Sequence, residues 1–312
     1  MNAPVVIATE GKVAAAPANL RAPDLLSLMA EVRSRAMAAR AVRPVPPVQP
    51  VPSVREVFFR RLPFLQLSDR IVFRFIMLVA RRQVVSISGI EHVQGPHPFI
   101  LALNHSTRRE AVVVPAALIF HRGGNLIHFW SDWIFRLIPG VGMILRRSGT
   151  ICVPTKRSRY RLLNWFKPLF TQPDPAFRQA RVLLESRRPV GVFPEGTVNR
   201  DPSRLLPGRF GAARLSLETG VPVVPAGIRF PGLSEGRARV PERAAIEIHI
   251  GAPLNPPRCA NGKPSFAEVR AWHSTIMSEI ARLSGKTWEW QAVGRRLAPA
   301  LPAPALPAAD AA

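Results

Sequence analysis

The sequence has few of the residues that build disulfide or metal frameworks. Its 312 residues include only two cysteines, Cys152 and Cys259, and one tyrosine. Two cysteines cannot form a disulfide framework, and the chain has neither a Cys-x-x-Cys nor a His-Glu-x-x-His spacing to hold a metal ion. We therefore expect a protein of a reducing compartment that contains no metal site.

Long apolar runs are also lacking. The longest, from 111 to 120, falls well short of the ~20 residues that a helix needs to cross a bilayer, and Pro115 interrupts it. After Met1, no basic run leads into an apolar core as it does in a secretory leader. The sequence thus predicts neither a secretory leader nor a membrane-spanning helix.

Acidic residues are scarce relative to basic ones. The chain has 43 basic and 20 acidic residues, a formal net charge of +23, and nearly all of the positive charge is arginine. This excess favours anionic partners such as nucleic acid, acidic lipid or phosphate-bearing substrates. No aromatic–basic readout motif or zinc spacing accompanies it, so we expect no specific binding of nucleic acid.

The ends of the chain differ in composition from its middle. Residues 1–52 are rich in alanine and proline and predict a disordered arm with one short helix at 24–39. Residues 296–312 have a similar composition and predict a disordered tail. Hydrophobic residues make up 47% of the chain, which is enough for a sizeable core, and we expect one domain over 53–295.

Residues 53–82 open this domain with large apolar side chains interleaved with arginines. The pattern predicts two short helices separated near Pro63. An amphipathic segment of this kind lies on an anionic membrane surface, or its helices pack on the core and point their arginines to water. The sequence leaves both interpretations open.

From 83 to 295 short apolar runs alternate with amphipathic segments. Strands are expected over 84–88, 99–103, 126–130, 149–153, 190–193, 221–228 and 245–250, and helices over 109–120, 131–137, 175–186, 209–218 and 265–283. This alternation is typical of an α/β fold, here a mixed, largely parallel β-sheet flanked by helices. Because prolines interrupt 221–228, that strand is expected at a sheet edge or at the floor of a site.

The first motif that carries chemistry follows the predicted strand 99–103. The apolar run stops at Asn104 and His105, and Glu110 comes five residues after the histidine, at the expected start of a helix. A histidine backed by a carboxylate has its tautomer fixed and its imidazolium stabilised, which suits a general base. Taken alone, the stretch favours a polar strand-to-helix turn that has no catalytic role.

The second motif is Phe193-Pro-Glu-Gly-Thr197, at the end of another predicted buried strand. Gly196 permits a tight turn, while Glu195 and Thr197 place polar groups at the strand end. In open α/β sheets, ligands bind outside the carboxyl ends of the strands. The second motif therefore stands where a ligand can bind.

Two further segments, Gly142–Arg147 and Val221–Pro225, complete a series of four blocks in order. Over about 84–250, the chain resembles the glycerolipid acyltransferases of the lysophosphatidic acid acyltransferase family. The resemblance implies transfer of a fatty acyl group from acyl-CoA or acyl carrier protein to a hydroxyl of a lysophospholipid. It also implies His105 as the general base, Glu110 as the acid that orients it, and no acyl-enzyme, metal or organic cofactor.

The same resemblance supplies a set of substrate-binding residues: Asn104, Arg146, Arg147, Glu195, Gly196, Thr197, Arg200 and Arg209. It implies that Arg146 or Arg147 faces the phosphate of the acceptor, and Arg209 stands where the family usually has lysine. The excess of basic residues, the arginine–aromatic segment at 53–82 and the lack of a spanning helix suit an enzyme that takes its acceptor from an anionic bilayer. We therefore expect a cytoplasmic enzyme that is peripheral on the inner face of the cell membrane.

The chain departs from the family pattern at two places. Glu110 replaces the usual aspartate, which keeps the charge but adds a methylene, and Val198 stands where an arginine often follows the second motif, with Arg200 two residues later. These departures leave two alternatives open. One is an acceptor without a phosphate, such as a lyso-ornithine lipid, and the other is a non-catalytic lipid-binding protein of the same fold.

Overall fold

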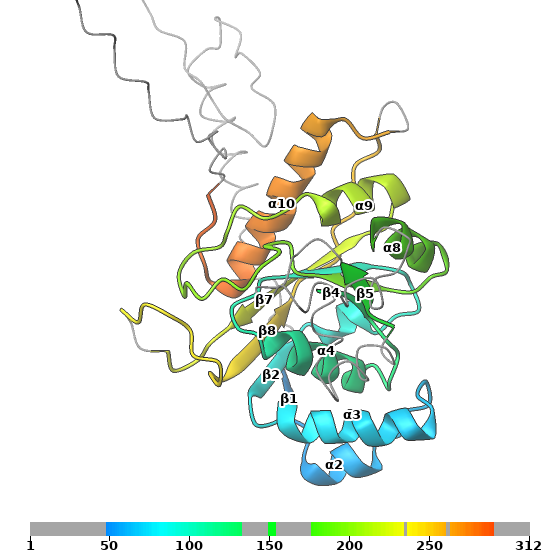
Figure 1. The fold of residues 1–312 in the computed structure, drawn as a ribbon, viewed down its shortest axis with the longest axis vertical. Helices are drawn as coiled ribbons and strands as arrows, with labels where there is room; N and C mark the ends of the chain where they lie inside the picture. The colour runs from blue at the N-terminus through cyan, green and yellow to red at the C-terminus, as the bar shows by residue number, and fades with distance from the viewer. Residues whose placement is uncertain (1–47, 133–148, 154–175, 234–235, 260–262, 290–312) are drawn as a thin grey trace, which may run out of the picture. The chain divides into compact units, whose positions relative to one another are not determined.

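The computed structural model describes residues 48–132, 149–153, 176–233, 236–259 and 263–289, all of which belong to the unit that begins at Pro47 (Figure 1). The strands are β1 (Val48–Pro50), β2 (Val84–Ser88), β3 (Ile100–Leu103), β4 (His128–Asp132), β5 (Ile151–Val153), β6 (Val190–Val192), β7 (Val223–Arg229) and β8 (Ile246–Ile250). The described helices are α2 (Val54–Phe59), α3 (Leu67–Ala80), the short 3-10 helix η1 (Ile90–Val93), α4 (Glu110–His121), α8 (Ala176–Glu185), α9 (Gly211–Thr219) and α10 (Phe266–Ser284).

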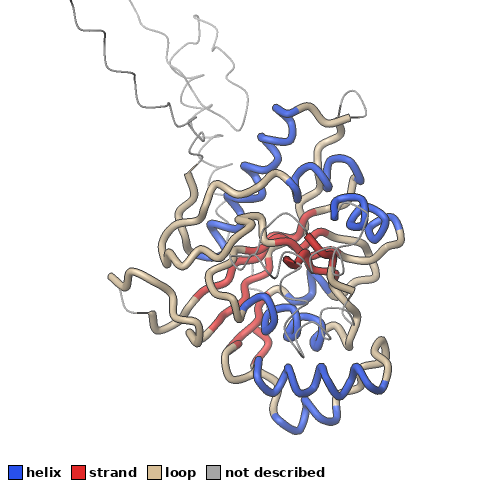
Figure 2. Tube along the Cα trace, viewed as in Figure 1, coloured by secondary structure: helices blue, strands red, loops and turns tan. Residues whose placement is uncertain are grey.

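The described strands form one eight-stranded sheet in the order β1-β2-β8-β7-β3-β6-β4-β5. The pairs β1–β2 and β7–β8 are antiparallel, and the others are parallel. Helices cover both faces of this sheet (Figure 2). The expected α/β fold with a mixed, largely parallel sheet is confirmed.

Strand β3 lies inside this sheet and is buried on both faces. Leu101 and Leu103 pack in the apolar cluster that includes α3 and α4, whereas Ile100 and Ala102 pack in the cluster that includes α8, α9 and α10. Successive side chains of a strand point to opposite faces, so a strand with helices on both sides needs a continuous apolar run. The carboxyl end of β3 therefore emerges between two packed layers.

Strand β7 corrects one expectation. It lies between β3 and β8, so Pro225 is not on an edge strand. The β7–β8 pairing begins at Ala226 opposite Ile250, and the amide of Gly251 donates to the carbonyl of Pro225 at 2.8 Å. The proline is tolerated because it stands where the ladder with β8 ends, and its missing N–H removes no interior ladder bond.

Two other boundaries also differ from the expectations. Ser131 lies inside β4, so it does not cap a helix there, and the rest of the predicted helix 131–137 falls mostly outside the described residues. Within the arm expected to be disordered, Val48–Pro50 forms β1 on the edge of the sheet beside β2. The other arm residues before 48, including the helix expected at 24–39, and the tail from 296 lie outside the described residues.

The break near Pro63 is confirmed, because α2 ends at Phe59 and α3 begins at Leu67. The last helix, α10, begins with a capping box. The Ser265 hydroxyl accepts from the Glu268 amide at 3.2 Å, and a Glu268 oxygen accepts from the Ser265 amide at 2.7 Å. Within the described part of the chain, no helix is both long enough and apolar enough to cross a membrane.

Candidate active site

The site begins at Asn104, which fixes the end of β3 to β7. Its side chain is fully buried; its Oδ1 accepts from the Ile228 amide at 2.7 Å, and its Nδ2 donates to the Ile228 carbonyl at 3.2 Å. A side-chain amide satisfies a backbone donor and acceptor together in the way a neighbouring strand does. Asn104, expected to bind substrate, is thus fully engaged by the protein.

His105 and Glu110 come together as the sequence predicted, with His105 in the turn and Glu110 as the first residue of α4. The distance from His105 Nδ1 to Glu110 Oε2 is 3.5 Å, and the same oxygen accepts from the Ser106 amide at 2.7 Å. Glu110 is completely buried, whereas the His105 side chain is 12% exposed. Because Nδ1 faces the carboxylate, Nε2 is the ring nitrogen that can meet a substrate.

The second motif lies against this turn. The His105 ring stacks on Phe193, with ring centroids 4.3 Å apart. Glu195 Oε1 accepts from the His105 amide at 2.9 Å, and Oε2 accepts from Asn199 Nδ2 at 2.7 Å and from the Leu206 amide at 3.0 Å. Glu195 therefore ties the end of β6 to the end of β3.

Burial also affects the charge state of Glu195. Desolvation raises the pKa of its carboxyl, while the hydrogen bonds from Leu206, His105 and Asn199 and the positive charge of Lys286 act in the opposite direction. Both carboxylate oxygens of Glu195 accept hydrogen bonds from other groups of the protein. Its main role is therefore to hold the site together, and contact with a head group is secondary.

Gly196 and Arg209 lie next to each other beside this motif. Gly196 has a φ of 67°, and a Cβ there would lie 2.6 Å from the Nε of Arg209. Thr197 and Arg209 are exposed. The structure therefore places Arg209, one of the predicted cations, beside the second motif with its side chain exposed.

The other predicted cations are placed differently. The guanidinium of Arg200 is paired with Glu242, whose second oxygen accepts from the Arg108 amide at 3.1 Å. Arg200 thus holds the loop at Glu242 against the His105 turn. Arg146 and Arg147 lie outside the described residues.

Lys286 belongs to the site but was not predicted from the sequence. Its Nζ donates to Ser106 Oγ at 2.8 Å and to the Asp201 carbonyl at 2.6 Å, although it is 180 residues from Ser106. Only two features of the sequence mark Lys286. It is one of five lysines in an arginine-rich chain, and it directly follows a helix-ending glycine. Asn199 and Glu242 were missed as well, because their partners are set by tertiary contacts.

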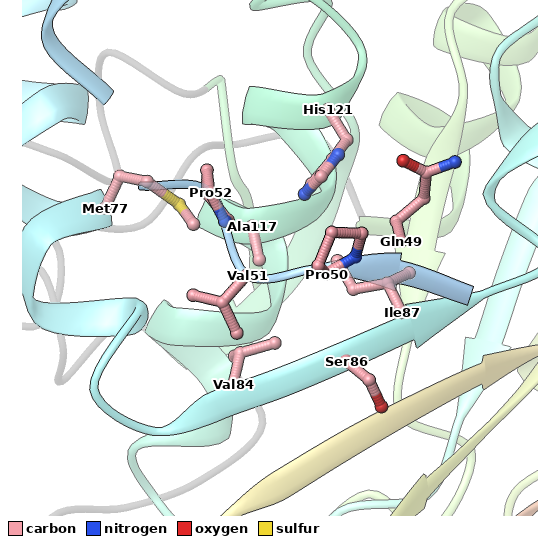
Figure 3. A pocket seen from close by; sticks show the side chains of 10 residues that line it. All are labelled: Gln49, Pro50, Val51, Pro52, Met77, Val84, Ser86, Ile87, Ala117 and His121. Atoms are coloured by element: carbon pink, nitrogen blue, oxygen red, sulfur yellow. The ribbon is translucent and has the colours of Figure 1, made fainter. Parts of the chain in front are cut away.

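A separate pocket contains none of the predicted site residues (Figure 3). It is a small hollow lined by residues of β1, β2 and helices α3 and α4. Burial, with the charge of Arg60, lowers the pKa of its His121 to about 4, so this imidazole is neutral at neutral pH. The lining residues therefore offer no charged group to an anionic substrate.

Among the described residues, no cluster of three or more histidine, cysteine or carboxylate side chains is placed to hold a metal ion. The polar groups at the end of β3 instead bond to one another and to the backbone. The arrangement is suited to proton transfer by a histidine that a carboxylate orients.

Comparisons with known proteins found one family model and similar solved structures. Residues 84–229 match the family model described as Acyltransferase. Among solved structures, the chain is similar to the 1-acyl-sn-glycerophosphate acyltransferase PlsC from Thermotoga maritima, with 21% identity, a TM-score of 0.46, and coverage of 74% of this chain and 88% of that one. No curated protein matches the chain. The matched segment contains both motifs and runs from the start of β2 to the end of β7, and it is a domain of the acyltransferase family.

Proposed function

We propose that this protein is an O-acyltransferase that moves a fatty acyl group from acyl-CoA or acyl carrier protein to a hydroxyl of a lysophospholipid. The observation that carries the proposal is the His105–Glu110 pair, which stands at the carboxyl end of a central parallel strand within an acyltransferase domain. The second motif supports the same turn from the neighbouring strand.

The chemistry follows from the placement of the histidine. With Nδ1 held by Glu110, Nε2 of His105 takes the proton of the acceptor hydroxyl as its oxygen attacks the thioester carbonyl carbon. The tetrahedral intermediate collapses with cleavage of the carbon–sulfur bond, and the imidazolium returns the proton to the leaving thiolate. An ester forms, a thioester is lost, and no covalent enzyme intermediate is needed.

We assign recognition of an anionic head group to Arg209. Its guanidinium lies against Gly196 of the second motif, and the side chain is exposed. A planar guanidinium can bind two oxygens of a phosphate at once. Arg146 and Arg147 remain candidates for the same role.

The helices α2 and α3, which precede the segment matched by the family model, suit a membrane surface. Three residues at helical spacing, Leu67, Ile71 and Phe75, form an outer stripe on α3 and are 63–70% exposed. The opposite face of α3 buries Phe73, Ile76 and Met77 in the core, so the helix is apolar on two sides. Exposed apolar stripes beside arginines are typical of helices that lie in the interface of an anionic membrane.

The sequence left open whether this segment lies on a membrane or packs on the core. In our proposal α3 does both, because one of its faces packs on the core while the outer stripe is available to lipid. We infer that the protein binds peripherally to the inner face of the cell membrane, from which it takes its acceptor. Phe59 and Phe64, which are also exposed, extend the apolar surface between α2 and α3.

One observation favours a second acceptor class. Arg200, expected near the phosphate, is committed to Glu242, which removes one of the cations that a phosphate would meet. An acceptor without a phosphate, such as a lyso-ornithine lipid, is therefore the second candidate. A panel of acceptors that includes both classes decides between them.

The test measures free-thiol release from long-chain acyl-CoA and acyl carrier protein, with that panel, on anionic vesicles. We expect release that requires one acceptor and falls on the order of 10² to 10⁴-fold in His105→Ala, the range that general bases contribute. His97→Ala, an exposed histidine before β3, is the matched control and keeps wild-type activity. Folded wild-type protein that binds lysolipid but releases no thiol with any pair would instead identify a non-catalytic lipid-binding protein.

A further inference from the structure

Lys286 is a buried cation beside the proposed catalytic turn and lies outside the segment that matches the family model. The residue is only 5% exposed. Its ammonium donates to Ser106 Oγ and to the Asp201 carbonyl, and the Phe230 ring lies 5.9 Å from Nζ. Burying an ammonium costs free energy unless the group is paired and hydrogen-bonded. The hydrogen bonds of Lys286 therefore compensate for its burial.

The chain holds Lys286 in place from both sides. Helix α10 ends at Gly285, which has a φ of 71°, and its last turn presses on β7 where Gly227 has no side chain. A Cβ at Gly227 would lie 2.1 Å from the carbonyl carbon of Leu283. On the other side, the Thr287 amide donates to the Ser203 carbonyl at 2.7 Å.

Three carboxylates act on the ammonium of Lys286. Glu195, Glu110 and Asp201 each favour its charged form, while burial acts against it and lowers its pKa overall. In return, the charge of Lys286 acts against the rise in the pKa of Glu195 that burial causes. His105 connects the two carboxylates of the site, since its amide bonds to Glu195 and its ring faces Glu110.

We propose that Lys286 is a positioning residue of the acyltransfer site. Through its bonds to the Ser106 hydroxyl and the Asp201 carbonyl, Lys286 holds the His105 turn against the loop at Asp201. Its positive charge also offsets the negative charge of the nearby buried carboxylates. The inference rests on the proposed function. Lys286 acts through Ser106 and not on the substrate, because its side chain is buried and its Nζ bonds to two protein oxygens. A shift of the base by about 1 Å is enough to cost on the order of 10² in rate.

The experiment compares Lys286→Met and Lys286→Arg with the wild type in the thiol-release assay. We expect kcat to fall at least about tenfold in Lys286→Met, whereas the acceptor KM changes less than about threefold, since the substrate contacts remain. Lys286→Arg retains the charge and recovers part of kcat. Lys263→Met, an exposed lysine before α10, serves as the matched control and behaves like the wild type.

The pH profile separates this role from simple structural support. Glu195 must be ionised to accept three hydrogen bonds, and without the lysine its pKa rises further. The acid limb of kcat should therefore move upward by at least about half a pH unit in Lys286→Met and stay in place in Lys286→Arg. Wild-type kcat with an unmoved acid limb in Lys286→Met would overturn the inference.

Thermal unfolding provides a readout that does not depend on turnover. Because burial raises the folded-state pKa of Glu195 above 4.5, its ionisation lowers stability as the pH rises above that value, and more so without Lys286. The difference in Tm between wild type and Lys286→Met should therefore widen from pH 4 to about pH 7. A constant difference contradicts the coupling to Glu195. Wild-type protein without turnover would refute the proposed function, and the Tm profile would still decide whether Lys286 controls these carboxylates.

Discussion

Asn104→Ala tests whether the first residue of the motif serves the protein or the substrate. In the structure its amide meets both backbone groups of Ile228, at 2.7 and 3.2 Å, and no part of the side chain is exposed. Alanine removes the side-chain amide that bonds to Ile228. The buried N–H and carbonyl of Ile228 on β7 then lose these hydrogen bonds. The end of β3, and with it the position of His105, is then held less firmly.

The cost follows from these two bonds. A buried backbone group that loses its hydrogen bond costs about 1–3 kcal/mol of stability. Because the turn can relax partially, we expect the free energy of unfolding to fall by about 2–4 kcal/mol for the two groups together. For a domain of this size, such a loss lowers Tm by about 5–15 °C. We expect kcat to fall with it, because the base is displaced while the acceptor contacts remain.

Thermal unfolding, denaturant titration and thiol-release kinetics measure these effects. Asn255→Ala is the control, because Asn255 is an exposed asparagine after β8, and it should leave Tm and kcat unchanged. The reasoning is refuted if Asn104→Ala melts like the wild type and raises only the acceptor KM. That result would assign Asn104 to substrate binding, as the sequence alone suggested.

Two further predictions concern the base and the membrane surface. Glu110→Gln keeps the shape of the acid but removes the charge that stabilises the His105 imidazolium, so kcat should fall on the order of 10² or more with little change in KM; a fully active variant would remove Glu110 from the mechanism. Serine at all three positions of the outer stripe of α3 removes side chains worth about 1.5–3 kcal/mol each when buried, so binding to anionic vesicles should weaken at least a hundredfold in a sedimentation assay. Phe266→Ser, which removes an equally exposed residue on α10, should bind as the wild type does; equal loss in both variants would contradict a specific membrane face.

The first motif could be predicted because its local sequence and its tertiary position carry the same information. A parallel strand that is buried on both faces requires a continuous apolar run, so polar residues directly after it must stand at the carboxyl edge of the sheet. That argument placed His105 and Glu110 correctly relative to β3 and α4. The resemblance to a family added the chemistry and also connected the second motif to the first.

Other parts of the site depend on contacts that no local pattern contains. Arg200 was expected to face substrate, but its partner Glu242 comes from a loop that the sequence does not place. Pro225 suggested an edge strand, since the end of the β8 ladder cannot be read from β7 alone. Lys286 is bonded to a residue 180 positions earlier, and only the packing of α10 on β7 reveals it.

The long sequence separation of these bonds has a consequence for folding. The turn that carries the base is secured by Ile228, 124 residues later, and by Lys286, 180 residues later. Contacts of such separation form late, because the entropy of closing long loops must be overcome first. During synthesis, the two motifs emerge well before α10, so the site is completed only when nearly all of the described chain has folded. The proposed thioester chemistry is therefore coupled to completion of the domain, because an unfinished chain carries both motifs before the bonds that fix the His105 turn have formed.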